Sequence, residues 1–183
     1  MMRTKQVAGM LLAAGLMGSA GLAQAGGYLG GGIGSASYDY DDVDNSTAIK
    51  LYGGYTAPLA PNSFFGVEAA YVDLGEADIT SLPGNWSLQM EGFSVAGLFQ
   101  YVLPDGGLGF FGKIGAYSLE TTLDTPYGSD SEDSAGLLWG LGLTYSLPSG
   151  LGFRGEIESY EGVDDYADDN AVTVLSAAVQ YNF

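Results

Sequence analysis

The feature that most constrains this fold is the alternation of side chains along residues 171–183. One set of alternate positions is mostly apolar and ends in aromatics, and the positions between include polar residues. The first set is Thr173, Leu175, Ala177, Val179, Tyr181 and Phe183, and the second includes Ser176, Gln180 and Asn182. Because successive side chains of a β-strand point to opposite faces, this pattern predicts a strand with one apolar and one polar face. Such a strand belongs in a sheet whose two faces meet different surroundings.

The same strand ending recurs at regular intervals. Residues 55–58, 101–104 and 145–148 share the pattern Tyr-x-x-Pro, with the tyrosines 46 and 44 residues apart, and Tyr181 is a fourth copy of the tyrosine. Each proline opens a short turn, since Pro and Gly supply the backbone dihedrals that tight turns need. We therefore predict four units, each made of a strand that leaves the short turns, a long loop and a returning strand.

The eight predicted strands and four long loops follow from this phasing. The strands are residues 27–37, 47–57, 64–74, 88–103, 109–119, 137–147, 151–159 and 171–183. The long loops are Ser37–Ser46, Gly75–Ser87, Glu120–Ala135 and Tyr160–Asn170. These loops carry 16 of the 22 acidic residues, so the end of the molecule opposite the short turns is expected to be strongly acidic.

The charges on the strands decide which face is inside. All bases of the predicted strands share the polar face with three glutamates, and this set is Lys50, Glu68, Lys113, Arg154, Glu156 and Glu158. The apolar face ends at the short-turn side in Tyr55, Phe65, Tyr101, Phe110, Tyr145 and Phe153. Aromatics at one level are typical of a membrane interface, and buried charges need partners. We therefore predict an all-β, eight-stranded antiparallel up-and-down transmembrane β-barrel, with an aromatic girdle outside and an ion-pair network in the lumen.

The N-terminal segment has the features of a cleaved export signal. Arg3 and Lys5 precede an apolar run over residues 7–22, and residues 23–25 fit an A-x-A cleavage pattern. We expect residues 1–25 to be a signal peptide removed after Ala25, and residues 26–183 to be the barrel. A membrane anchor is the less favoured alternative, because the run is short and rich in Gly and Ala.

Three segments resemble the eight-stranded outer-membrane β-barrel superfamily of Gram-negative bacteria, which includes the membrane domain of OmpA, OmpX and the opacity-type surface proteins. The segments are Phe65–Gly75, Trp139–Tyr145 and Ala177–Phe183. The resemblance implies an outer-membrane location, contact with outer-membrane lipid and lipopolysaccharide, delivery by periplasmic chaperones and insertion by the barrel-assembly machinery. It also implies that Val179, Tyr181 and Phe183 form the assembly signal that this machinery reads. We expect a monomer.

Composition restricts the chemistry that this chain can perform. It has no Cys and no His, and its formal net charge is −17. Nucleic-acid binding is disfavoured, because contacts to phosphates need Lys and Arg. The side chains used most often for general-base and zinc chemistry are missing. Glu156 and Glu158 could act as an acid/base pair, but an ion-pair role is favoured. We expect no enzymatic activity, no catalytic residue, no cofactor and no metal.

Two acidic runs, residues 39–44 and 164–169, raise the question of calcium, which prefers carboxylate oxygens. Neither run fits the EF-hand loop, and a solvated, repelling surface is favoured. The alternative is weak bridging by divalent cations to lipopolysaccharide phosphates. Residues 107–113 match only half of a phosphate-binding loop, because Ile114 stands where Ser or Thr is required, and we interpret them as a turn and a strand.

Two functions fit this barrel. The first is a structural and surface role, with a lumen closed by polar side chains and acidic extracellular loops for surface interaction. The alternative is a narrow pore, or a conduit for small molecules in the manner of OmpW. Small residues on the predicted lumen face support that alternative, and they are Gly92, Ser94, Ala96, Gly140, Gly142, Ser176 and Ala178. A periplasmic lipocalin-like binder would share the strand number, but the outward aromatics argue against it.

Overall fold

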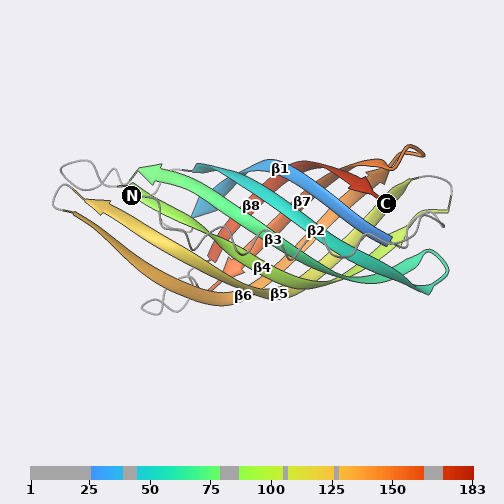
Figure 1. Cartoon of the computed structure of the whole chain (residues 1–183), viewed down its shortest axis with the longest axis horizontal. Helices are drawn as coiled ribbons and strands as arrows, with labels where there is room; N and C mark the ends of the chain where they lie inside the picture. Colours follow the sequence, from blue (N-terminus) through green and yellow to red (C-terminus); the bar gives the residue numbers. More distant parts are fainter. Residues whose placement is uncertain (1–25, 39–44, 79–86, 105–106, 126–127, 163–170) are drawn as a thin grey trace.

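The computed structural model describes residues 26–38, 45–78, 87–104, 107–125, 128–162 and 171–183. They form a closed barrel in which each strand pairs with its sequence neighbours and the last pairs with the first, all antiparallel. The strands are β1 (Gly26–Tyr38), β2 (Ser46–Ala60), β3 (Ser63–Asp78), β4 (Ser87–Val102), β5 (Leu108–Thr125), β6 (Gly128–Ser146), β7 (Leu151–Glu161) and β8 (Ala171–Asn182). Figure 1 shows them tilted across the long axis of the barrel. The predicted eight-stranded antiparallel up-and-down barrel is confirmed.

Some predicted features lie outside the described residues. They are the signal peptide, residues 1–25, and the acidic runs 39–44 and 164–169. In the part of the chain that the structure does describe, no helix is long and apolar enough to cross a membrane.

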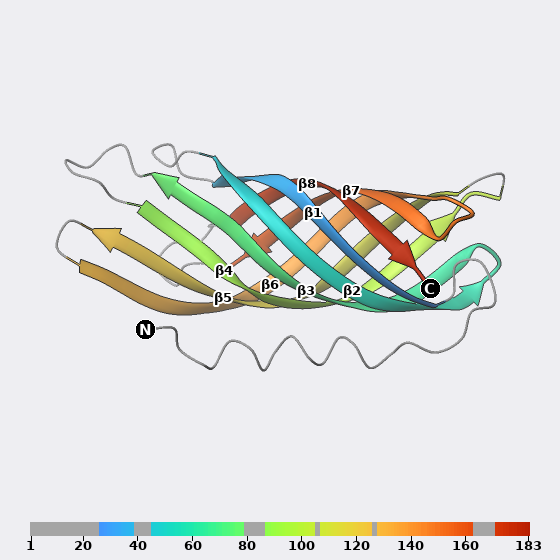
Figure 2. The same ribbon diagram turned by 45° about the horizontal axis from the view of Figure 1, so that its top comes forward.

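The barrel closes along a seam between β1 and β8. Their pairing runs from Tyr28 opposite Asn182 to Tyr38 opposite Val172. A hydrogen bond from the Phe183 backbone N–H to the Gly27 carbonyl, 2.9 Å long, continues the seam past the end of β8. Figure 2 places the C-terminus at the end of the barrel where the short turns lie. Closure provides hydrogen-bond partners for the backbone groups of β1 and β8, the first and last strands, as a hydrocarbon environment requires.

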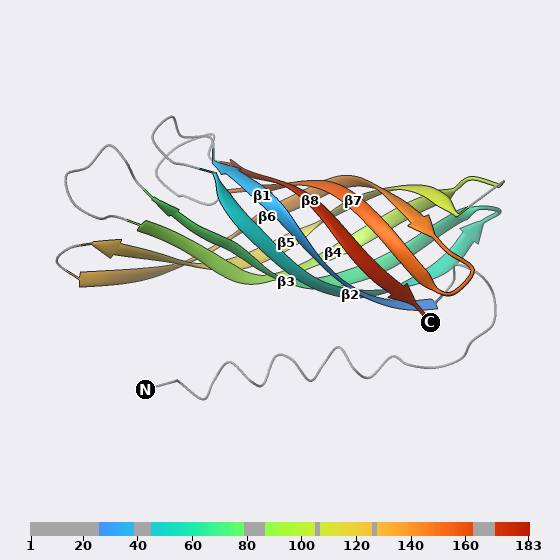
Figure 3. The same ribbon diagram turned by 90° about the horizontal axis from the view of Figure 1, so that it is seen from above.

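The strands of the central hairpins are longer than the sequence predicted. The predicted loop Glu120–Ala135 is wrong, because β5 continues to Thr125 and β6 begins at Gly128, with these two residues paired. The predicted loop Gly75–Ser87 also begins too early, since β3 runs to Asp78. Figure 3 shows β3 to β6 reaching further than the other four strands at the end opposite the C-terminus. Backbone pairing holds this extension together although its side chains are polar on both faces, which is why its sequence resembles that of a loop.

Exposure separates the two faces of the barrel wall. Apolar side chains of the outward register are open to their surroundings, with Ile33 65% and Val95 63% exposed. The charged side chains of the inward register are enclosed, with Lys50 5% and Glu158 1% exposed. An apolar outside and a polar inside are the reverse of a water-soluble barrel and are typical of a barrel that faces lipid.

Candidate functional site

The candidate site is a cluster of six charged side chains in the lumen, and Glu68 on β3 lies at its centre. Arg154 on β7 donates from Nη1 to Glu68 Oε2 over 2.5 Å and from Nη2 to Oε1 over 3.2 Å. Lys113 on β5 lies 3.1 Å from Glu68 Oε1, and Lys50 on β2 lies 4.0 Å from the same oxygen. One carboxylate therefore faces all three bases, and it is only 3% exposed.

The other two acids come from β7 and connect the two lysines. Lys50 Nζ lies 2.7 Å from Glu156 and 2.8 Å from Glu158. Lys113 Nζ lies 2.8 Å from Glu156 and 2.5 Å from Glu158. Arg154 adds a contact of 2.9 Å to Glu156. The structure thus brings together all six charged residues that the sequence placed on the lumen face, and we call them the ion-pair network. Its three positive and three negative charges balance, which offsets the cost of removing them from water.

Aromatic rings enclose the ion-pair network on the side of the short turns, and sequence reasoning did not assign them to it. The Arg154 guanidinium lies over the rings of Phe111 and Tyr52, with its central carbon 4.1 Å and 4.6 Å from their centroids. The Tyr28 hydroxyl donates to Glu68 over 2.9 Å. The sequence pattern could have identified them, because all three aromatics occupy positions on the inward face of their strands.

Glycines on the neighbouring, paired strands make room for these rings. A Cβ on Gly30 would collide with the Tyr52 ring, a Cβ on Gly54 with the Tyr28 hydroxyl, and one on Gly142 with Phe111. An eight-stranded barrel has an interior just wide enough for side chains to fill. Each of these three rings therefore stands opposite a glycine, which accounts for part of the high glycine content.

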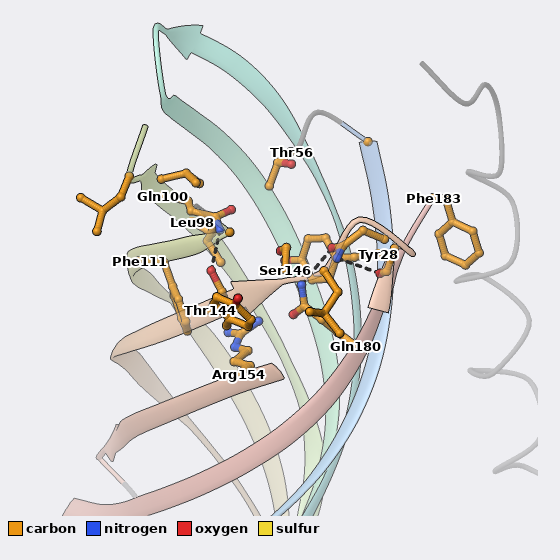
Figure 4. A pocket seen from close by; sticks show the side chains of 18 of the residues that line it. Tyr28, Thr56, Leu98, Gln100, Phe111, Thr144, Ser146, Arg154, Gln180 and Phe183 are labelled. Carbon is orange, nitrogen blue, oxygen red and sulfur yellow. Dashed lines mark hydrogen bonds between the residues drawn. The ribbon is translucent and has the colours of Figure 1, made fainter. Parts of the chain in front are cut away.

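A cavity of about 740 Å³ lies between the network and the short-turn end of the barrel (Figure 4). Its wall includes the neutral polar side chains of Thr56, Gln100, Thr144 and Gln180, together with Arg154 of the network. Gln100 donates to Thr144 over 2.9 Å, and Tyr52 donates to Gln180 over 3.3 Å. The small residues that supported a conduit do not line this cavity; they are Gly92, Ser94, Ala96, Gly140, Gly142, Ser176 and Ala178.

The half of the lumen away from the short turns is lined largely by apolar side chains, which the sequence did not predict. Buried side chains cluster there, and they are Ala36, Tyr38, Ala48, Val72, Leu74, Met90, Ala96, Tyr117, Leu119, Leu138, Tyr160, Val172 and Val174. On β2, β3, β5 and β7 they occupy the same inward register that carries the network charges nearer the short turns. The sequence shows the alternation of these positions. Where apolar residues occupy both faces of a strand, however, the alternation does not reveal which face points into the lumen.

The acids of the lumen are already engaged by neighbouring bases. Among the described residues, no group of three or more His, Cys, Asp or Glu side chains could hold a metal ion. Glu156 and Glu158, considered above as an acid/base pair, are both ion-paired to Lys50 and Lys113.

The predicted aromatic girdle and assembly signal lie on the outward face. Tyr55, Phe65, Tyr101, Phe110, Tyr145 and Phe153 are between 40% and 53% exposed. Val179, Tyr181 and Phe183 are 47% to 49% exposed, and the rings of Tyr181 and Phe183 contact edge to face at 5.2 Å. Tyr181 stands opposite Leu151 and Leu29, so the end of β8 is held from both sides.

Solved structures of three other barrels are similar to this one. They are Ail, the attachment invasion locus protein of Yersinia pestis (TM-score 0.59, 16% identity, covering 86% of this chain and 97% of that chain), Neisserial surface protein A (0.59, 13%, 86% and 97%) and the N-terminal β-barrel domain of Pseudomonas aeruginosa OprF (0.55, 12%, 85% and 97%). At these identities the likeness concerns the fold. A search of curated proteins found no match.

A family model described as "Outer membrane protein beta-barrel domain" matches residues 7–183, which is nearly the whole chain. That match agrees with the closed eight-stranded barrel and its outward apolar face, and it places the protein in the outer membrane. The chain therefore belongs to the outer membrane β-barrel domain family.

Proposed function

We propose that this protein is a non-conducting outer-membrane barrel that acts through its structure and its extracellular surface, and that it is not an enzyme. The observation that carries the proposal is the ion-pair network. Each of its six charges lies within 3.1 Å of at least one opposite charge, and all six are 5% exposed or less. Ions would have to displace these contacts to pass, and separating buried ion pairs is costly.

The expected result is therefore silence in a planar lipid bilayer. We would refold the chain from residue 26 onward in detergent, insert it and record single-channel currents, with a conducting porin as a positive control in the same bilayer. Heat-modifiable migration on a gel would show that the inserted protein is folded. Steady, reproducible channels from the wild-type protein would contradict the closed lumen and favour the pore or conduit.

The surface part of the proposal rests on charge. Four carboxylates on adjacent strands stand opposite one another in a row, namely Asp73 beside Glu91, Glu91 beside Glu120, and Glu120 beside Asp133. The row borders the outward aromatic residues: the Tyr71 hydroxyl donates a hydrogen bond of 2.7 Å to Glu91. Like charges that face each other across strands repel. We infer that this acidic row, like the predicted acidic loops, attracts cations and cationic surfaces at the membrane boundary, where lipopolysaccharide also lies.

One of the similar structures, Ail, was solved in complex with the heparin analogue sucrose octasulfate. A polysulfated ligand would be repelled by the acidic row, so the proposed surface partners differ in charge from that ligand. At an ionic strength of 0.15 M the screening length is about 8 Å, so each carboxylate of the row repels an anion only at close range.

We expect the row to contribute measurably to the binding of a cationic probe. The change is Asp73→Asn, Glu91→Gln, Glu120→Gln and Asp133→Asn together, in barrels held in vesicles of a zwitterionic lipid. Binding of a lysine-rich peptide should weaken about tenfold, taking roughly 0.3–0.5 kcal/mol for each exposed charge. A control variant removes the same number of charges from the first acidic run, with Asp39, Asp41, Asp42 and Asp44 each changed to Asn. Equal losses in both variants would show that total charge matters and the position of the row does not.

A further inference from the structure

The lumen changes chemistry between the ion-pair network and the extracellular end. On β3, the network residue Glu68 is followed on the same inward face by Val72 and Leu74, which are 1% and 0% exposed. On β5, Lys113 is followed by Tyr117 and Leu119, which are 3% and 0% exposed. The inward register is thus charged at one level of the barrel and apolar at the next. We call the apolar cluster of thirteen residues described above the upper plug.

The outward register changes in the opposite sense at the same level. Leu74 faces inward next to the outward Asp73, Met90 next to Glu91, and Leu119 next to Glu120. Further down the strands the apolar side chains face outward and the charges inward. This inversion marks the level at which the barrel leaves the lipid. Above it the barrel has an apolar core and a polar exterior, so the hydrophobic effect holds it together as in a water-soluble barrel.

The few polar groups within the upper plug are occupied by partners inside the protein. The Tyr117 hydroxyl donates to the Glu161 carbonyl over 2.9 Å, and the Tyr38 hydroxyl contacts the Ser46 hydroxyl over 3.1 Å. The Tyr160 hydroxyl lies 3.5 Å from Glu158 of the network, and its ring meets that of Tyr117 at 5.4 Å. These hydroxyls therefore already have hydrogen-bond partners within the protein.

We propose that the lumen is sealed twice, by the ion-pair network and independently by the upper plug, so that breaking the network alone does not open the barrel. An apolar constriction blocks ions because water leaves it, without any charged gate. The two seals rest on different physics, ion pairing in one and apolar burial in the other. This inference rests on the proposed closed lumen and adds which layers close it.

The test compares four proteins by conductance in planar bilayers. The network variant carries Glu68→Ala with Arg154→Ala, which removes one acid and one base and leaves two of each. The plug variant carries Leu119→Ser with Leu138→Ser, two side chains that are fully buried. The third variant combines all four changes, and the fourth protein is the wild type. Wild type, network variant and plug variant are expected to be silent, and only the combined variant is expected to conduct.

Each outcome decides a separate point. Channels in the wild type would overturn the proposed closed lumen itself. Channels in the network variant alone would overturn the double seal and leave the closed wild-type lumen intact, because the plug would then fail to hold. Silence of the folded combined variant would also overturn the inference, since these two layers would not be what closes the barrel.

A second measurement keeps the inference testable if the combined variant does not fold. The chain has no Cys, so an Ala48→Cys substitution places a single thiol in the upper plug. A small charged thiol reagent added outside vesicles should leave this thiol unmodified in the otherwise wild-type protein and in the network variant. It should modify the thiol in the plug variant. Equally fast modification in all three backgrounds would overturn the plug as a seal.

Discussion

Replacing Glu68 by Ala is expected to lower the free energy of unfolding by about 3–5 kcal/mol, because removing one partner of a buried ion-pair group leaves an uncompensated charge. Glu68 contacts all three bases of the network, with Arg154 at 2.5 Å, Lys113 at 3.1 Å and Lys50 at 4.0 Å. Its loss also leaves the Tyr28 hydroxyl without the acceptor at 2.9 Å. The lumen would then hold three positive and two negative charges.

Urea unfolding of the barrel in lipid vesicles measures this effect. Glu91→Ala is the matched control, because Glu91 is an acid of a neighbouring strand that lies on the outward face and loses only the hydrogen bond from Tyr71. It should change the stability by about 1 kcal/mol or less. The double variant Glu68→Ala, Arg154→Ala restores charge balance and should recover part of the loss. A single variant as stable as the wild type, or a double variant no better than the single, would contradict a coupled network.

The number of strands, their faces and the six network residues were all readable from the sequence. Alternation fixes which residues share a face, so Lys50, Lys113 and Arg154 had to lie together inside or together outside. The Tyr-x-x-Pro repeat then set the number of strands, because each copy marks the end of one strand and the start of a turn. These are local patterns of period two, and the barrel preserves them in its register.

Contacts across the lumen were not readable in the same way. That the Arg154 guanidinium lies between the rings of Phe111 and Tyr52 depends on which strands face each other across the barrel, and alternation within one strand carries no such information. The sequence also does not show which glycines stand opposite those rings. Gly54 opposite Tyr28 becomes meaningful only once the register between β1 and β2 is known.

The extension of β5 and β6 was missed for a different reason. In the part of the extension that lies beyond the upper plug, neither face of the strands packs on an apolar core or on lipid, so acids and hydroxyls occur at successive positions, as in Glu132, Asp133 and Ser134. The period-two signal disappears while the backbone pairing continues from Leu119 to Thr125. The inward residues Leu119 and Leu138 at the base of this extension were also given no role. Leu119 lies between Ser118 and Glu120, where the apolar outward face of β5 has ended, and Leu138 lies between two apolar outward residues that hide its inward position.

Replacing Phe183 by Ser is expected to remove most of the folded protein from the outer membrane. We propose that the assembly machinery implied by the family resemblance reads β8, the last strand of the barrel, together with Phe183 directly after it. Its ring contacts Tyr181 at 5.2 Å, and its backbone N–H reaches Gly27 across the seam. A serine keeps that backbone bond possible and removes only the ring, so a loss of assembly would report on the aromatic side chain.

Phe110 provides the matched control, because it is an aromatic of the same outward girdle and has the same exposure of 47%. Phe110→Ser also removes a phenyl ring from the outward surface, but it leaves β8 and the residue after it unchanged. If Phe183 acts as an assembly signal, only Phe183→Ser should reduce the heat-modifiable band in outer-membrane fractions, with unfolded chain accumulating in or being cleared from the periplasm. If the heat-modifiable band decreases equally in both variants, the outward aromatics as a group stabilise the inserted barrel and Phe183 has no separate role. Purified Phe183→Ser protein that refolds in detergent as well as Phe110→Ser would place the defect in delivery and insertion, since the two barrels would then be equally competent to fold.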